Sequence, residues 1–186
     1  MNKAEIRKQA LLQRKSMSPE EASVFNLKLL EHFKKLGFSS VKTLHIFLPI
    51  AEKNEPDTFL LIDWLNRAHP EIKIIVPRAD FDTFLMSNYV YEGKERLEKN
   101  RHNILEPQKT NLHEGAVDMV IIPLLGFDLK GYRAGYGKGF YDRFLNGIST
   151  VKVGLNFFAP VDVIDDVHEN DIILDLCITP DKIYFF

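Results

Sequence analysis

A glycine-rich segment is the part of this sequence best suited to chemistry. Six of the 10 glycines fall between Gly126 and Gly147. Three of these, Gly135, Gly137 and Gly139, occupy every second position in the segment that connects a predicted strand to a predicted helix. Glycine tolerates positive φ and lets the backbone approach a ligand closely. Because a helix start also offers unpaired N–H groups and a positive dipole end, the segment predicts a loop that binds anions, most plausibly phosphates.

Two cationic residues belong to the same loop. Arg133 and Lys138 would add mobile positive charge to it. The spacing matches neither the GxxxxGK[ST] phosphate loop nor the dinucleotide fingerprint. A tight strand-to-helix turn, with glycines present only for steric reasons, is therefore the alternative interpretation.

The first predicted helix carries a second group of cations. Lys3, Arg7 and Arg14 are spaced so that, at 100° per residue, they lie within about 40° of one another on a helix. Such a basic stripe is usually a face exposed to solvent. The more specific hypothesis is that Lys3 and Arg7 reach a polyphosphate held by the glycine loop.

Carboxylates that could serve a metal ion or a ligand occur in three places. Mg²⁺ bound with a nucleotide needs only one or two carboxylates, and Asp142, just after the glycine loop, is the best single candidate. Glu55 follows a predicted strand at the edge where open α/β sheets bind ligands, whereas Asp57 or Thr58 would cap the next helix. A cluster of six acids, for which solvated loop residues are the usual explanation, comprises Asp162, Asp165, Asp166, Glu169, Asp171 and Asp175.

Alternating helices and apolar strands must position these residues. A helix is predicted over 2–16, and a second helix starts with Ser18 as N-cap and Glu21 as capping-box partner and ends at Gly37. Further helices are predicted at 57–68 and 139–147, loops and turns over 92–116, and strands at Thr43–Leu48, Ile72–Val76, Phe84–Tyr91, Asp118–Ile122, Val151–Leu155 and within 176–186. This alternation predicts a mostly parallel sheet covered on both faces.

Composition limits the class of protein. The chain has 186 residues, 45% hydrophobic and 27% charged, with a formal net charge of −2, which indicates a single domain over 1–186. The near-neutral charge argues against a general nucleic-acid binder. No apolar run approaches the ~20 residues of a membrane span, and the N-terminus does not read as a signal peptide. The single cysteine, Cys177, lies in an apolar run and is expected in the core. We therefore expect a cytoplasmic monomer without nucleic-acid or membrane partners.

The segment from Ile122 to Leu145, with its GYRAGYGKGFYD core, resembles the signature of the 5-formyltetrahydrofolate cyclo-ligase family. Other pieces fit in the right order, so the resemblance covers essentially the whole chain. They are Lys3-xxx-Arg7 with a later Arg14, the stretch from Phe47 and Leu48 to Glu55, Pro56, Asp57 and Thr58, the run Asn103 to Pro107, and Asn170 with Asp171.

The resemblance implies a fold and an activity. The fold is a three-layer α/β/α domain with a mostly parallel sheet, similar to sugar-phosphate isomerases and CoA transferases. The activity is an ATP- and Mg²⁺-dependent closure of 5-formyltetrahydrofolate to 5,10-methenyltetrahydrofolate, with release of ADP and phosphate. The reaction would pass through a phosphorylated formyl oxygen, and N10 would attack the formyl carbon.

The resemblance also assigns residues. Arg133 and Lys138 would be catalytic, and Asp142 and Asp171 would hold Mg²⁺. ATP would contact Lys3, Arg7, Arg133, Ala134, Gly135, Tyr136, Gly137, Lys138, Gly139, Phe140 and Tyr141. The folate would contact Leu48, Glu55, Tyr136, Gly137, Lys138, Gly139 and Phe140.

This sequence departs from the family pattern at a few positions. Ala134 stands where Leu is usual, and Phe140 where Tyr is common. The loop 49–54 is slightly longer than expected, so Glu55 is better fixed in register than Leu48. None of these departures removes a catalytic charge.

Two other functions compete with this interpretation. A sugar-phosphate or acyl-CoA enzyme on the same fold would bind phosphate without ATP turnover, but it would leave the pair Asp142 and Asp171 without a role. A nucleic-acid-binding module would use the basic stripe of the first helix, and its affinity would fall steeply with salt.

Overall fold

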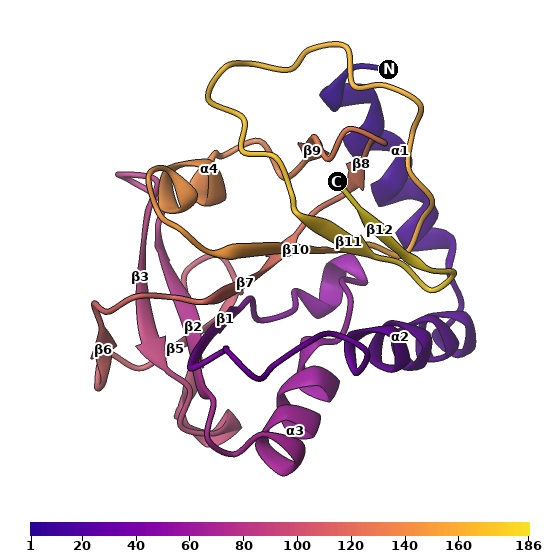
Figure 1. Ribbon diagram of the computed structural model, residues 1–186. Coiled ribbons are helices and arrows are strands. Elements are labelled where there is room, and N and C mark those ends of the chain that lie inside the picture. Colours follow the sequence, from indigo (N-terminus) through magenta and orange to yellow (C-terminus); the bar gives the residue numbers. More distant parts are fainter.

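Eight strands form one central sheet in the computed structural model, which describes residues 1–186 (Figure 1). Their order is β12-β11-β10-β7-β1-β2-β3-β6. The strands are β1 (Thr43–Ile46), β2 (Lys73–Asp80), β3 (Leu85–Val90), β6 (Leu112–His113), β7 (Met119–Pro123), β10 (Val151–Leu155), β11 (Leu176–Ile178) and β12 (Ile183–Phe185). From β11 to β2 the neighbours are parallel, and β12, β3 and β6 join antiparallel. The predicted, mostly parallel sheet is confirmed.

Helices cover both faces of this sheet and give the three layers that were predicted. On one face lie α2 (Pro19–Phe33) and α3 (Thr58–Ala68), and on the other lies α4 (Phe140–Leu145). The short hairpin β8 (Gly126–Phe127) and β9 (Arg133–Ala134) carries α1 (Lys3–Ser16) against it. Figure 1 shows the β8–β9 hairpin between α1 and α4, and residues of all three elements line the site described below.

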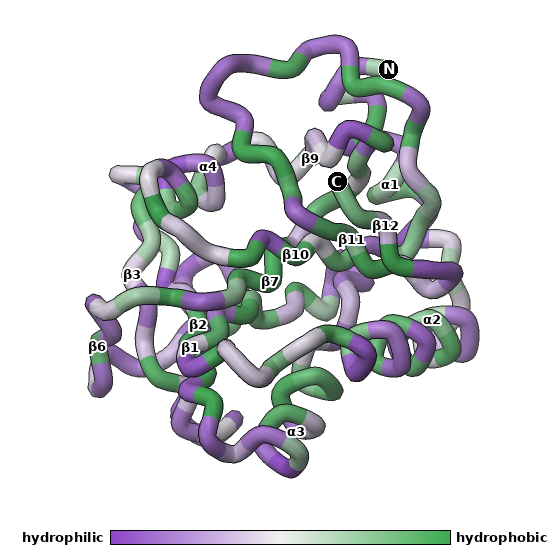
Figure 2. Tube along the Cα trace, in the orientation of Figure 1, coloured by the Kyte–Doolittle hydropathy of each residue, from purple (hydrophilic) through white to green (hydrophobic).

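Alternating side chains along each central strand divide the core in two. In β1, Leu44 and Ile46 are fully buried on the side of α2 and α3, together with Ile121 of β7. The intervening residues Val120 and Ile122 pack into the smaller cluster on the opposite face. This period of two is what a sheet buried on both faces requires. Figure 2 shows the resulting concentration of apolar residues along the central strands.

The predicted helix starts are confirmed by their hydrogen bonds. Glu21 N donates to Ser18 Oγ (3.1 Å) and Ser18 N donates to Glu21 Oε2 (3.0 Å), which is a complete capping box. Asp57 caps α3 by accepting from Phe59 N (3.1 Å). By contrast, α2 ends at Phe33 and not at Gly37, because its last turn tightens into bonds between residues three apart.

The strand ends and the middle of the chain differ from the prediction. β2 continues through Pro77 to Asp80, although a stop at Pro77 was expected. Its pairing with β1 reaches only Ile75, so the missing N–H of the proline breaks no bond on that side. The expected loop region 92–116 also holds regular structure, namely η2 (Lys94–Arg96), β4 (Leu97–Lys99), β5 (Leu105–Pro107) and β6.

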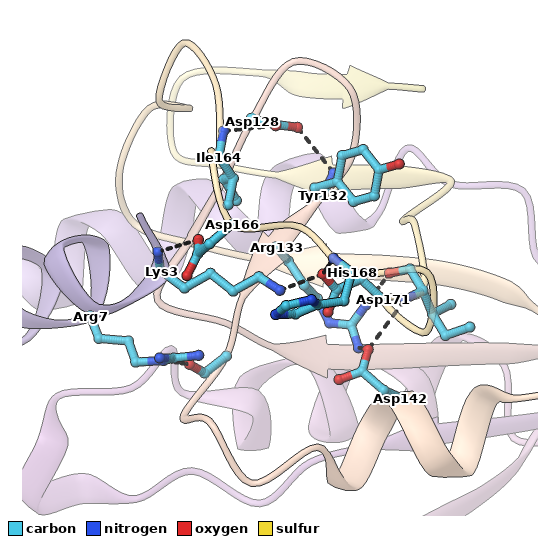
Figure 3. A network of polar contacts seen from close by, with 12 residues as sticks. Lys3, Arg7, Asp128, Tyr132, Arg133, Asp142, Ile164, Asp166, His168 and Asp171 are labelled. Carbon is cyan, nitrogen blue, oxygen red and sulfur yellow. Dashed lines mark hydrogen bonds and ion pairs between the residues drawn. The ribbon is translucent and has the colours of Figure 1, made fainter. Parts of the chain in front are cut away.

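The C-terminal loop 156–175 fastens the start of α1 to the rest of the domain. Asp166 accepts a hydrogen bond from Lys3 N (2.7 Å). Asp128 is fully buried and accepts from the N–H groups of Lys130, Tyr132 and Ile164 at 3.0–3.1 Å (Figure 3). Four of the six acids grouped from the sequence have protein partners, namely Asp165, Asp166, Asp171 and Asp175. The cluster is therefore mostly structural, and the usual explanation as solvated loop residues does not hold for these four. No helix has the length and apolar character needed to cross a membrane.

Candidate functional site

A cavity of about 340 Å³ lies at the carboxyl ends of β1, β2 and β7. This is the edge of a parallel sheet where ligands bind in open α/β folds. Of the residues assigned to the site from the sequence, those that line the cavity are Lys3, Arg7, Leu48, Glu55, Arg133, Gly135, Tyr136, Gly137, Lys138, Gly139, Phe140, Tyr141, Asp142 and Asp171. Ala134 is the exception, because its side chain is fully buried with Ile6 and Ile164 behind the hairpin.

The basic stripe of α1 faces this cavity and the glycine loop. Lys3 and Arg14 are both buried, so the interpretation of the stripe as a solvated face is wrong. Arg7 Nε donates to Gly135 O (2.7 Å), and its two terminal nitrogens have no partner in the protein. Lys3 Nζ forms an ion pair with Asp171 (Figure 3). The stripe is thus not the exposed basic face that a nucleic-acid module would need.

Positive φ angles in the glycine loop explain why two of its residues are glycines. Gly137 has φ +84° and Gly139 has φ +68°. A Cβ at position 137 would lie 3.3 Å from the Arg7 guanidinium carbon, so a side chain there would be strained and would crowd a cation of the site. The helix that follows, α4, has only six residues and is shorter than the expected 139–147. Side-chain charge therefore contributes most of the attraction for anions.

Arg133 and Lys138 differ sharply in mobility. Arg133 is buried and held on both sides, since its Nη2 donates to Asp142 Oδ1 (2.6 Å) and its Nη1 donates to Ile172 O. The expected mobile charge at Arg133 is therefore wrong. Lys138 is exposed, with its Nζ 5.8 Å from the centre of the Phe84 ring, and keeps the freedom to follow a ligand.

The two carboxylates proposed for Mg²⁺ each keep one oxygen without a protein partner. Asp142 uses Oδ1 for Arg133 Nη2 and Ile172 N, which leaves Oδ2. Asp171 uses Oδ2 for Lys3 Nζ and His168 N, which leaves Oδ1. No group of three or more His, Cys, Asp or Glu side chains is placed to hold a metal ion by itself. The donor set therefore fits an ion that takes most of its ligands from phosphate and water.

Glu55 also lines the cavity and is nearly buried, at 7% exposure. Its Oε1 accepts from the Tyr136 hydroxyl (2.5 Å) and its Oε2 accepts from Ile50 N (2.7 Å). Burial raises the pKa of Glu55, and these hydrogen bonds and the charges of Arg14 and Lys53 oppose the rise. Each oxygen retains a free lone pair, so the carboxylate can accept two N–H groups of a ligand.

A buried histidine that the sequence did not distinguish from other core residues anchors α4. His45 Nδ1 donates to Asn88 Oδ1 (2.9 Å), and its Nε2 accepts from the Tyr141 hydroxyl (3.1 Å). Phe144 packs on the imidazole with ring centres 5.0 Å apart. His45 thereby fixes the helix whose next residue, Asp142, faces the cavity. The one feature that distinguishes His45 is its position on the face of β1 opposite Leu44 and Ile46, and this can be recognised only once the fold is known.

Acid should destabilise the protein through His45. Burial lowers the pKa of His45 from 6.5 to about 4, so below pH 6.5 the unfolded chain binds a proton that the folded chain refuses. The contribution of neutral His45 to the free energy of unfolding is complete above pH 6.5. It is lost as the pH falls to about 4, by about 3 kcal/mol in all. Denaturant unfolding across this range should show a steeper loss for the wild type than for His45→Gln. Parallel curves for the two proteins would contradict the assignment.

Several residues that line the cavity carried no signal in the sequence. Phe81, Met86 and Ile104 come from the β2–β3 turn, β3 and the loop before β5, far apart in the chain. Phe81 meets Phe140 edge to face, with ring centres 5.3 Å apart. These side chains give the cavity an apolar wall, which meets the end of the glycine loop at Phe140. A cavity with one apolar and one cationic wall can hold a flat ring system beside a polyanion.

Known proteins are similar to this sequence over most of its length. Residues 1–180 match the 5-formyltetrahydrofolate cyclo-ligase family. A 5-formyltetrahydrofolate cyclo-ligase from Mycoplasma pneumoniae is 31% identical over 186 residues, which cover 96% of this chain and 98% of that protein. The protein of the same name from Escherichia coli is 32% identical over 149 residues, which cover 76% and 80%.

Solved structures agree with the sequence matches. An NMR structure of the 5,10-methenyltetrahydrofolate synthetase of Aquifex aeolicus superimposes with a TM-score of 0.83 at 29% identity, covering 100% of this chain and 93% of that chain. The 5,10-methenyltetrahydrofolate synthetase of Mycoplasma pneumoniae gives 0.74 at 28% identity, covering 96% and 98%. Sequence and fold lead to the same assignment: the chain belongs to the 5-formyltetrahydrofolate cyclo-ligase family and is an enzyme.

Proposed function

We propose that the chain closes 5-formyltetrahydrofolate to 5,10-methenyltetrahydrofolate with ATP and Mg²⁺, releasing ADP and phosphate. The observation that supports this most directly is the cavity itself. One of its walls carries Lys3, Arg7 and Lys138 for a polyanion, and another carries the buried acceptor Glu55. A site that only hydrolyses ATP would need the first wall alone, whereas ring closure needs both ligands held together.

The chemistry of the substrate explains why ATP is needed. The oxygen of an N-formyl amide is a poor leaving group, so direct attack by N10 on the formyl carbon stalls. Transfer of the γ-phosphoryl group to that oxygen breaks the bond to ADP and gives an iminium phosphate. N10 then adds to the formyl carbon and loses its proton, and the C–O bond breaks to release phosphate. The protein's task is positioning and charge stabilisation.

The cations divide this task by their mobility. Arg133, held by Asp142 and the carbonyl of Ile172, offers a fixed charge at the floor of the loop. Arg7 presents two free terminal nitrogens, and such a planar fork matches phosphate oxygens. Lys138 is exposed and can follow the γ-phosphoryl group as it moves. These roles for Arg133 and Lys138 are the catalytic roles we propose.

Asp142 and Asp171 are the residues we propose to hold Mg²⁺, through the oxygens that face no protein donor. Bound there with the nucleotide, the ion would neutralise phosphate charge and orient the transferred group. Lys3 and Arg133 already fix the other oxygen of each carboxylate. The protein thus orients both acids before a ligand arrives.

The folate would lie between Glu55 and the aromatic wall. Glu55 can accept two adjacent N–H donors of the pterin at once, and hydrogen bonds to an ionised acceptor are stronger than those between neutral groups. Leu48 is buried beside it and Phe140 forms the facing aromatic surface. A monomeric active form stays a prediction. A cytoplasmic location stays a prediction.

The test is direct assay of the ring closure. Protein, 5-formyltetrahydrofolate, ATP and Mg²⁺ are mixed, and the near-ultraviolet absorbance of the methenyl product is followed while each component is omitted in turn. We expect a rise that needs all four components. A folded protein that gives no rise would refute the proposal, and turnover without ATP would refute the phosphorylation step.

A further inference from the structure

Arg14 is the one member of the basic stripe that does not reach the cavity. Its side chain is 1% exposed and it is not among the residues that line the hollow. An arginine is almost never buried to this degree unless its charge has a specific partner. Neither the anion-binding role of Lys3 and Arg7 nor a solvated surface accounts for it.

Arg14 contacts two neighbours of Glu55, one through its backbone and one through its side chain. Its backbone carbonyl accepts from Asn54 Nδ2 (2.7 Å), and Asn54 directly precedes Glu55 in a left-handed conformation, with φ 45°. Its guanidinium donates from Nη1 to the Tyr136 hydroxyl (3.1 Å) and from Nη2 to Leu124 O (2.7 Å). The backbone of Arg14 therefore contacts Asn54, which precedes Glu55, and its side chain contacts Tyr136, which is hydrogen-bonded to Glu55.

The direction of the hydrogen bonds in this chain is fixed by chemistry. A guanidinium can only donate, so the Tyr136 hydroxyl accepts from Arg14 and uses its single proton to donate to Glu55 Oε1 (2.5 Å). Such a series polarises each bond toward the carboxylate. It favours the ionised form of Glu55 and opposes the protonated one, which would present an O–H where the chain supplies a donor.

We propose that Arg14 is a positioning residue for substrate recognition: through Tyr136 its guanidinium holds the buried Glu55 carboxylate ionised and turned toward the folate ring. This inference rests on the proposed function, because Glu55 is taken to bind the pterin. It adds a residue that touches no ligand. The specificity of the pocket then depends on a side chain buried behind its wall.

The other groups around Glu55 do not replace Arg14. Lys53 lies on an exposed turn, with its Nζ 4.4 Å from the centre of the Tyr136 ring, so solvent screens its charge. The hydroxyls of Tyr136 and Tyr141 stay protonated, because burial raises the pKa of both. Arg14 is thus the buried cation among the groups that face this carboxylate.

The experiment compares three variants of α1 with the wild type by calorimetric binding of 5-formyltetrahydrofolate and of a non-hydrolysable ATP analogue. Arg14→Met removes the charge, Arg14→Lys keeps it, and Lys15→Met is the matched control on an exposed neighbour. We expect Arg14→Met to bind the folate roughly tenfold or more weakly at neutral pH, with ATP-analogue affinity unchanged. The acid limb of folate binding should shift to higher pH, and Arg14→Lys should recover part of the loss. Equal loss of both ligands, with the acid limb unmoved, would show a merely structural role and overturn the proposal.

A second measurement separates this proposal from the proposed function. The carboxyl carbon of Glu55, assigned by its disappearance in Glu55→Gln, is titrated by NMR without any ligand. We expect its pKa to be higher in Arg14→Met than in the wild type. An unchanged pKa refutes the role of Arg14, even if the protein binds folate; a raised pKa without folate binding refutes the proposed function alone. Should Arg14→Met fail to fold, Tyr136→Phe interrupts the same chain at one oxygen, and an unmoved Glu55 pKa there is equally decisive against it.

Discussion

Replacing Asp142 by alanine is expected to reduce turnover by at least about 10²-fold at ordinary Mg²⁺ concentrations. The substitution removes the free carboxylate oxygen that faces the cavity and also releases Arg133 and the N–H of Ile172 from Oδ1. Steady-state kinetics should show that a higher Mg²⁺ concentration restores part of the activity. The protein should fold, because Asp142 is only partly buried, but with a lower free energy of unfolding, because the buried Arg133 loses its charged partner.

Two controls separate the metal role from the structural one. Asp142→Asn keeps an oxygen for Arg133 but lacks the charge, so it should lose turnover while its unfolding curve lies closer to the wild type than that of Asp142→Ala. Asp162→Ala removes an exposed acid of the C-terminal loop and should leave turnover unchanged. Wild-type turnover by Asp142→Ala, with an unaltered Mg²⁺ dependence, would remove Asp142 from the metal site.

The second large effect is expected at Glu55. Glu55→Gln should weaken binding of 5-formyltetrahydrofolate about 10- to 100-fold, because one acceptor oxygen becomes a donor and the charge is lost. The ATP analogue should bind as before, since the nucleotide wall is built from other residues. Calorimetric titration with each ligand separately measures both effects.

The pH dependence of folate binding gives an independent check on Glu55. Burial raises its pKa, and recognition requires the ionised form. Wild-type affinity should therefore be full at high pH and fall as the pH drops through that raised pKa, whereas Glu55→Gln should be flat there. Glu52→Gln, on the same loop but exposed and outside the cavity, serves as the control. Equal loss of folate and ATP-analogue affinity in Glu55→Gln would count against a pterin role.

The sequence predicted those features whose cause lies within one short segment. The four apolar runs that became β1, β2, β7 and β10 are the central strands of the sheet. The Ser18 capping box and the Asp57 cap were predicted because each needs residues only two or three positions apart. The glycine loop and its cations were found in the same way. Their anion-binding chemistry could be predicted from the spacing of residues within one short segment.

Features that depend on tertiary contacts were not predictable in this way. The fixed state of Arg133 needs Ile172, and the burial of Arg14 needs Leu124, each more than 30 residues away. β3 joins the sheet edge by antiparallel pairing with β2, and β6 by antiparallel pairing with β3; no pattern inside 84–116 sets these partners. The assignment of Asp171 to the site came from resemblance to a family, since nothing in its own segment distinguished it from neighbouring acids.

The two ion pairs on the cavity wall make the site internally compensated. Lys3 is paired with Asp171 and Arg133 with Asp142, so an anion that binds alone competes with these carboxylates, and a cation that binds alone is repelled by these buried cations. A phosphate group that arrives together with its counter-ion provides new partners for both members of each pair. The nucleotide and the metal should therefore strengthen each other's binding by the same factor. On the proposed function, this wall should bind the metal–nucleotide complex more tightly than it binds either component alone.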